Sequence, residues 1–312
     1  MLSSHSGWKR MNQNHNASLR VYLEAKRKVI DEALERYIPA EDNYPAVIFK
    51  AVRYSLFAGG KRIRPILCLA SAEAAGGNIE SITPVACSLE LIHTYSLIHD
   101  DLPAIDDDDY RRGRLTSHKV FGEAIAILAG DALLTEAFRL MSDANLLEKI
   151  PPEKLLLVIR DIANAAGYFG MVGGQVVDVQ SEGKDVDSGV LNYIHTRKTG
   201  AMITAAVKAG AILSNAGEVE LNSLISYGRH MGLAFQIVDD ILNVEGDKAS
   251  LGKGTGSDAK RGKVTYPALM GLEASRKRAS ELVESALSAL KNFDHRAEPL
   301  RLIAGYIVDR RS

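Results

Sequence analysis

The stretch of sequence that says most about the fold is LELIHTYSLIHDDLPAIDDDDYRRG, residues 89–113. Its first half is apolar on most helical faces, which is typical of a helix inside a bundle. Pro103 lacks an amide proton, so this helix is expected to end or kink before Asp106. Six aspartates lie between Asp100 and Asp109. Such a run alone is most often a solvated acidic loop, but a distortion at Pro103 would bring Asp100 and Asp106 toward one hollow.

Helical spacing of apolar residues recurs along most of the chain, and no segment alternates as a strand does. The sequence therefore predicts an all-α fold: a single large helical bundle around a central cavity. The polar, aperiodic residues 1–17 predict a flexible N-terminal segment, followed by a single domain over 18–312. Beyond the helix that starts near Leu19, the expected helices cover 46–57, 65–76, 81–102, 117–129, 131–143, 152–167, 187–213, 218–244, 266–291 and 294–309.

The composition is that of a globular protein, with 46% hydrophobic and 25% charged residues. A net charge of −1 argues against a general nucleic-acid binder. Two cysteines, Cys68 and Cys87, are too few for a disulfide framework, and no leader pattern opens the chain. The longest apolar runs are shorter than the roughly 20 residues of a membrane span. We expect a cytoplasmic protein without a transmembrane helix.

A second acidic pair lies in QIVDDILNV, within an apolar helical pattern. Asp239 and Asn243 are four residues apart and share a face, with Gln236 nearly on the same side. A charge buried among apolar neighbours is costly, so a cation would explain the pair, and Mg²⁺ prefers carboxylate oxygen and bridges to phosphate. The alternative is a partly exposed helix face with local ion pairs.

Basic residues gather near glycines at four places: Lys61, Arg62 and Arg64 in GGKRIRP; Arg111, Arg112 and Arg114 in YRRGR; Lys198 with Thr199 in KTG; and Lys253, Lys260, Arg261 and Lys263 in GKGTGSDAKRGK. Backbone amides at glycine approach anions closely, and arginine grips two phosphate oxygens at once. Each segment alone could be a solvated turn, but alternation with two acidic pairs predicts diphosphate sites. No P-loop, HExxH, CxxC or calcium-loop pattern is present.

Taken in order, these segments resemble the trans-prenyltransferases, and among them the bacterial farnesyl diphosphate synthases. The resemblance rests on GGKRIRP (59–65), LIHDDLPAIDDDDYRRG (97–113), GDALL (130–134), GGQVVD (173–178), KTG (198–200), FQIVDDILNVEGD (235–247) and GKVTYP (262–267). It implies an all-α bundle, usually a homodimer, that joins isopentenyl diphosphate to an allylic diphosphate, dimethylallyl or geranyl, to make (2E,6E)-farnesyl diphosphate.

The resemblance also implies roles for individual residues. Asp100, Asp106 and Asp239 would hold three Mg²⁺ ions, and Asp101 and Asp240 would support them. The allylic substrate would contact Arg111, Lys198, Thr199, Gln236, Lys253 and Lys263. Isopentenyl diphosphate would contact Gly60, Lys61, Arg64, His93 and Arg112. Tyr95 and the adjacent Ser96 would limit chain length, although core packing is an equally good reading of a buried tyrosine.

One position departs from the family pattern, which commonly has a third aspartate where this chain has Asn243. An amide carbonyl can still accept a hydrogen bond from a metal-bound water, but it carries no charge. We expect weaker metal binding at this second acidic pair. The alternatives are a geranylgeranyl diphosphate synthase, which differs in pocket depth, a class I terpene cyclase, and a noncatalytic regulatory subunit.

Overall fold

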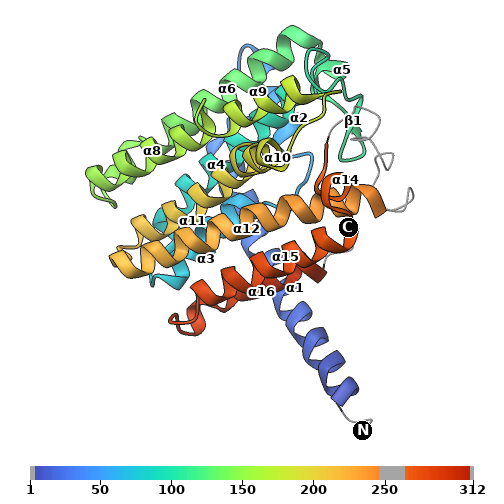
Figure 1. The fold of residues 1–312 in the computed structure, drawn as a ribbon. Helices are drawn as coiled ribbons and strands as arrows, with labels where there is room; N and C mark the ends of the chain where they lie inside the picture. The colour runs from blue at the N-terminus through green and yellow to red at the C-terminus, as the bar shows by residue number, and fades with distance from the viewer. Residues whose placement is uncertain (1–3, 246–263, 310–312) are drawn as a thin grey trace.

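The computed structural model (Figure 1) describes residues 4–245 and 264–309. Its main helices are α1 (Ser4–Tyr37), α2 (Ala46–Leu56), α3 (Ile63–Ala74), α4 (Ile79–Asp100), α6 (Glu123–Met141), α8 (Pro152–Ala166), α9 (Met171–Ser181), α11 (Ala201–Leu213), α12 (Glu218–Glu245), α15 (Leu272–Ala289) and α16 (Glu298–Asp309). Shorter elements are β1 (Tyr110–Arg111), β2 (Arg114–Leu115), α5 (Ser117–Phe121), α7 (Ala144–Leu147), α10 (Ser188–Ile194), the π-helix η1 (His195–Gly200), α14 (Tyr266–Met270) and the 3₁₀ helix η2 (His295–Ala297). The predicted all-α fold is confirmed.

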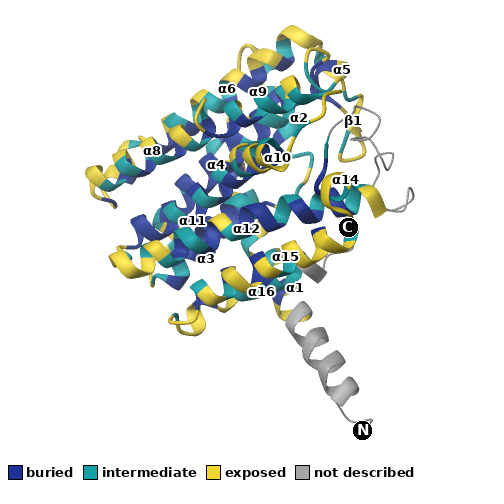
Figure 2. Cartoon of the chain, viewed as in Figure 1, coloured by how far each residue is buried: buried dark blue, intermediate teal, exposed yellow. Residues whose placement is uncertain are grey.

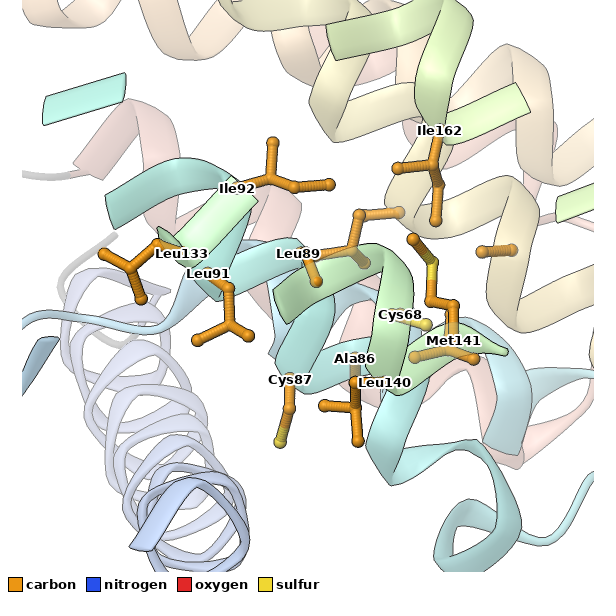
Figure 3. Close-up of a cluster of buried hydrophobic side chains, with 14 of the residues drawn as sticks. Cys68, Ala86, Cys87, Leu89, Leu91, Ile92, Leu133, Leu140, Met141 and Ile162 are labelled. Carbon is orange, nitrogen blue, oxygen red and sulfur yellow. The ribbon is translucent and has the colours of Figure 1, made fainter. Parts of the chain in front are cut away.

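The core consists of two clusters of buried apolar side chains. The first gathers around α4 and α6 and includes Leu89, Leu133 and Met141, which are labelled in Figure 3. The second gathers around α12, α15 and α16. Helices α3 and α11 supply residues to both clusters, so they join the two halves of the bundle. Figure 2 shows the buried positions concentrated along these central helices.

Helix α4 is the interior helix that the opening stretch predicts. It packs against α3 and α6, and thirteen of its residues are buried, including Glu90 and Tyr95. It ends at Asp100, before Pro103, as expected from the missing amide proton of proline. The buried side of this helix therefore reaches the acidic segment with its carboxylates at the helix end.

Several boundaries differ from the sequence prediction. Helix α1 extends back to Ser4, into the segment 1–17, since adding residues to an existing helix costs far less than nucleating one. That this segment is flexible and that 18–312 form one domain stay predictions. The break expected near residue 130 lies instead at Gly122, where φ is +84° and favours glycine. The segment 266–291 is interrupted at Gly271, and α9 was not expected.

The prediction of no strands was also wrong in one place. Residues 110–115 form a two-stranded antiparallel hairpin, with Tyr110 opposite Leu115 and Arg111 opposite Arg114. Each strand is two residues long, too short to show an alternating pattern. Its role is local, because it folds the chain after the acidic run back toward α4.

One stretch, Pro152–Ser181, is long and apolar enough to cross a membrane by length and composition. It consists of two helices, α8 and α9, and 39% of its most apolar window is buried in the bundle. Core helices of globular proteins pass the same test, so this single stretch is weak support for a membrane span.

Candidate active site

A cavity of about 630 Å³ lies between α3, α4, α9 and η1. Its wall combines charged side chains with an apolar surface. It brings together seven of the predicted site residues: Arg64, His93, Tyr95, Ser96, Asp100, Lys198 and Thr199. The apolar part includes Ile105 before the hairpin and Met171, Val172 and Val176 on α9. Such a wall suits a ligand with an anionic head and an apolar chain.

The first acidic segment turns back onto the end of α4. The amide of Asp106 donates to the carbonyl of Asp100 at 2.8 Å, and the amide of Asp108 donates to the carbonyl of Asp101 at 3.2 Å. This turn brings the charge of Asp106 close enough to act on Asp100. The expected distortion at Pro103 therefore does place the two carboxylates near one another, which a continuous helix would not do.

The Asp100 carboxyl has an unusual environment. Burial raises its pKa to about 6, with a further contribution from Asp106, while the charge of Lys198 opposes the rise. A cation beside the two carboxylates would relieve both the desolvation and the repulsion. Within the described ranges, no group of three or more His, Cys, Asp or Glu side chains could hold a metal ion alone. Two neighbouring carboxylates have the chemistry that Mg²⁺ prefers, because this ion binds few carboxylates and can complete its shell with water and phosphate oxygens.

Asp101, next to Asp100 in sequence, has a different partner. It is 4% exposed and accepts hydrogen bonds from Nε of Arg111 at 2.6 and 2.7 Å. Burial opposes the charge of Arg111, but the hydrogen bonds and charge of Asp101, together with the charges of Asp108 and Asp100, outweigh burial and raise the pKa of the guanidinium. This pair ties the hairpin to the end of α4. Arg111 and Asp101 line a separate small hollow, outside the main cavity.

In the second acidic pair, as in the first, one aspartate is buried against fixed partners and the other is less buried. Asp240 is 8% exposed, and its Oδ2 lies 2.9 Å from Nε2 of His195 and 2.9 Å from the backbone nitrogen of Tyr266, which donates to it. The imidazole of His195 stacks on the Tyr266 ring at 5.4 Å. Asp239 is partly buried, and its charge counteracts the drop in the pKa of Arg64. Asp240 thus links α12 to η1 and α14.

The KTG segment forms part of the π-helix η1, inside the region predicted as one continuous helix. Rare π-turns recur at functional sites. Lys198 is 2.7 Å from Asp178 on α9. A side chain at Gly174 would meet the backbone of Lys198 at 2.3 Å, and one at Gly232 would meet Gly200 at 2.7 Å. These close approaches hold η1 between α9 and α12.

The GGKRIRP segment divides its cations between the cavity and the interior. Arg64 lines the cavity, where burial lowers its pKa. Lys61 is exposed. A Cβ at Gly60 would lie 2.8 Å from the Arg112 guanidinium, and Arg112 donates to the carbonyl of Gly59. Gly60, Lys61, Arg112 and Gln236 are absent from the lining of the main cavity.

Arg62, in contrast, is 3% exposed and lies inside the bundle. It donates to Asp31 at 2.9 Å, to Glu90 at 2.7 Å and to the carbonyl of Leu56 at 2.8 Å. Arg62 also has φ of 51°, so these bonds stabilise a backbone shape that side chains rarely adopt. Arg62 therefore holds the loop before α3 against the interior of the bundle.

Four residues of the site were missed. Glu90 lies between two leucines of an interior helix, which is itself a signal for a paired buried charge. Gln175 and Asp178 belong to GGQVVD, quoted above without a role. Both side-chain polar atoms of Gln175 are buried in the cavity wall, without a hydrogen bond to any residue that the structure describes. His195 precedes the KTG segment, and no local pattern indicated its contact with Asp240.

Two predicted ligands, Lys253 and Lys263, lie outside the described residues. His93, in the wall of the main cavity, is held neutral. Burial, followed by the charges of Arg64 and Arg112, keeps its pKa well below the ordinary value for histidine. A neutral imidazole donates one hydrogen bond without adding charge to a cationic cluster.

Comparison with known proteins identifies the family of the chain. The polyprenyl synthetase family matches residues 45–300. A geranylgeranyl diphosphate synthase of Cyanophora paradoxa is 48% identical to this chain, and the match covers 95% of this chain and 97% of the relative. A farnesyl diphosphate synthase of Geobacillus stearothermophilus is 46% identical, and the match covers 94% of this chain and 98% of the relative. The solved FPP/GFPP synthase of Zymomonas mobilis is 37% identical with a TM-score of 0.83, covering 94% of this chain and 99% of its own. The chain therefore belongs to the polyprenyl synthetase family and is a trans-prenyltransferase with the all-α isoprenoid synthase fold.

Proposed function

We propose that the protein condenses isopentenyl diphosphate with dimethylallyl or geranyl diphosphate and releases (2E,6E)-farnesyl diphosphate. The observation that carries this proposal is the main cavity, whose wall joins Arg64, Asp100 and Lys198 to an apolar lining. The diphosphate requires the charged groups, and the prenyl chain requires the apolar ones. The relatives named above catalyse, by their names, syntheses of this class.

Mg²⁺ is the cofactor that we assign, as three ions once diphosphate is bound, with Asp100, Asp106 and Asp239 as their protein ligands. Members of the family generally use Mg²⁺. When bound, the metal offsets the negative charge that develops on the departing diphosphate. Asp101 and Asp240 act indirectly, because their contacts hold Arg111 and His195 in place.

The cations divide between two substrates in this proposal. The allylic diphosphate is bound by Arg111, Lys198, Thr199 and Gln236, with Lys253 and Lys263. Isopentenyl diphosphate is bound by Gly60, Lys61, Arg64, His93 and Arg112. The neutral imidazole of His93 donates to a phosphate oxygen, while Arg64 supplies charge.

The reaction then follows from this placement. The carbon–oxygen bond of the allylic diphosphate breaks, and the electron pair leaves with the diphosphate. The double bond of isopentenyl diphosphate forms a new carbon–carbon bond to the allylic cation, and the departing diphosphate takes the proton lost from the adjacent carbon. Ile105, Met171 and Val176 exclude water, which would otherwise capture the cation.

Tyr95 supports a fifteen-carbon product. It is 7% exposed, lines the main cavity next to Ser96, and meets the His99 ring edge-on at 5.7 Å. On α4 it lies five residues before Asp100, about 7.5 Å along an ideal helix. A ring at this depth limits chain growth. The geranylgeranyl diphosphate synthase relative makes a twenty-carbon product the competing candidate.

The test is a condensation assay with Mg²⁺, isopentenyl diphosphate and either allylic starter, followed by chromatographic sizing of the products. We expect a fifteen-carbon product from the natural chain and longer products from Tyr95→Ala. Twenty-carbon products from the natural chain would favour the alternative synthase. Hydrocarbon release would favour a cyclase, and no elongation under any metal condition would favour a regulatory subunit.

We also propose a homodimer in the cytoplasm. Exposed apolar side chains on α5 and α6, including Val120, Ile127 and Leu128, support a second copy as their cover. The two free, buried cysteines are compatible with a reducing compartment. Analytical ultracentrifugation and cell fractionation test these points: a monomer at micromolar concentration, or recovery outside the cytoplasmic fraction, would contradict them.

A further inference from the structure

A second cavity, of about 740 Å³, shares no lining residue with the main cavity. Side chains of α8, η1, α11, α12 and α15 surround it. We call it the cationic cleft and define it by Arg197, Lys208, Arg229 and Arg278. No role in the proposed reaction falls on these residues.

The charge of the cleft is unbalanced. Its four lining cations face one lining carboxylate, Asp161, which lies 2.7 Å from Lys208. Arg197 donates to the carbonyl of Phe169 at 3.2 Å, and a neutral carbonyl does not balance the charge of a guanidinium group. Arg278 approaches Glu281 only at 3.5 Å, on an exposed surface where such pairs contribute little. Over residues 17–245 and 264–307, Arg229 has no hydrogen bond or ion pair.

The cleft is not uniformly polar. Phe169, Leu233 and Leu282 add an apolar surface to the cationic one. Cavities that bind small molecules are typically about 300–1,000 Å³, so the size suits an organic anion. One guanidinium group can bind two phosphate oxygens at once. Two or three such groups therefore suit a diphosphate ligand better than a ligand with a single carboxylate.

The π-helix η1 connects the cleft with the active site. Thr196, Arg197 and Gly200 line the cleft, whereas Lys198 and Thr199 line the main cavity. Gly200 also packs closely against Gly232 on α12, where a Cβ at Gly232 would lie 2.7 Å from Gly200. A ligand that draws Arg197 toward Arg229 therefore acts on the backbone that carries Lys198.

From these contacts we propose that the cationic cleft is a second, noncatalytic site for a diphosphate, and that its occupancy alters the active site through η1. The diphosphate is either the inorganic diphosphate released by the reaction or the head of a prenyl diphosphate, whose tail would cover Phe169 and Leu282. The choice of these two ligands rests on the proposed function, whereas the anion site itself rests on the cleft.

Isothermal titration calorimetry tests the site. The Asp100→Asn chain is used in EDTA, so that metal-dependent binding and turnover in the main cavity are suppressed. Inorganic pyrophosphate and geranyl diphosphate are the two probes. Arg229→Glu and Arg278→Glu are each compared with Lys277→Glu, which reverses a neighbouring exposed charge outside the cleft.

We expect Arg229→Glu and Arg278→Glu to raise the dissociation constant of one binding event about tenfold or more, since each removes a charged hydrogen bond and adds repulsion. Lys277→Glu is expected to have little effect because Lys277 is exposed and outside the cleft lining, and exposed charges contribute little. Equal affinity for both probes identifies inorganic diphosphate, and tighter binding of geranyl diphosphate identifies the prenyl ligand. Unchanged isotherms in both cleft variants, or an equal loss of affinity in Lys277→Glu, would overturn the proposal of a site in the cleft.

Kinetics separate this proposal from the proposed function. In the otherwise natural chain with Mg²⁺, added pyrophosphate should inhibit condensation with a component that excess allylic substrate does not reverse. Arg229→Glu should remove that component and retain turnover without added pyrophosphate. Retention of the component in Arg229→Glu would refute the coupling. Absence of condensation in the natural chain would refute the proposed function, while the calorimetric result on the cleft would stand.

Discussion

The two acidic pairs look alike in sequence, yet they are held by different means. At the end of α4, Asp101 is bound by Arg111, ten residues away, through two short hydrogen bonds. On α12, Asp240 is bound by His195, 45 residues away, and by the amide of Tyr266, 26 residues away. The first arrangement closes a local turn, and the second joins three helices.

The two members of the first pair also have different surroundings. Asp100 lines the main cavity and has a raised pKa, whereas Asp101 is buried against a guanidinium. In the proposed mechanism, each doubled aspartate therefore supplies one group for the ligand and one group that holds the framework. The predictions below test this division within each pair and between the two pairs.

The largest expected effect is on catalysis at Asp100. Asp100→Asn removes the charge that Mg²⁺ requires but preserves the shape of the side chain, so kcat should fall by about 10²–10³-fold. Asp107→Asn, in the same acidic run but exposed, is the matched control and should change kcat little. Steady-state assays over a range of Mg²⁺ concentrations measure both. Similar losses in the two variants would mean that the run acts only by its total charge.

The next effect is on stability at Asp101. Asp101→Ala leaves the Arg111 guanidinium without its main partner, and we expect the free energy of unfolding to fall by about 2–3 kcal/mol. Adding Arg111→Ala should recover part of that loss, because the unpaired charge is then absent. Urea denaturation followed by circular dichroism gives both values. Strictly additive losses would show that the pair does not stabilise the hairpin.

A smaller loss of stability is expected at Asp240. Asp240→Ala leaves the Tyr266 amide and His195 without an acceptor, at a cost of about 1–2 kcal/mol. Unlike Asp101→Ala, it should also increase hydrogen exchange of amides at the start of α14 and in η1, because Asp240 links these elements. If exchange rises only near residue 240, the contact is local, and the contrast between the two pairs is lost.

The smallest effect is expected at Asn243. Asn243→Asp adds a carboxylate one helical turn after Asp239, at a partly buried position. If the amide weakens metal binding there, the Mg²⁺ concentration for half-maximal activity should fall by up to about fivefold, as expected for a partly exposed charge pair worth at most about 1 kcal/mol. Asn215→Asp, at the end of α11, serves as a control. An unchanged Mg²⁺ requirement would show that Asn243 takes no part in the site.

The sequence alone determined the all-α class, the end of the interior helix before Pro103, and most of the charged residues that meet at the cavity. These features depend on helical spacing, on the missing amide of proline and on glycines beside cations, all of which are local. Arg64, Asp100 and Lys198 could be named from such patterns before their distances were known.

Only the tertiary structure decided which charge serves which task. Arg62 and Arg64 are equivalent cations in GGKRIRP, yet one is buried against Glu90 and Asp31 and the other faces the cavity. The π-turn at KTG and the contact of Asp240 with His195 likewise depend on close packing between distant segments. Burial and partners separated by 26 to 45 residues are properties of packing, so no local pattern can specify them.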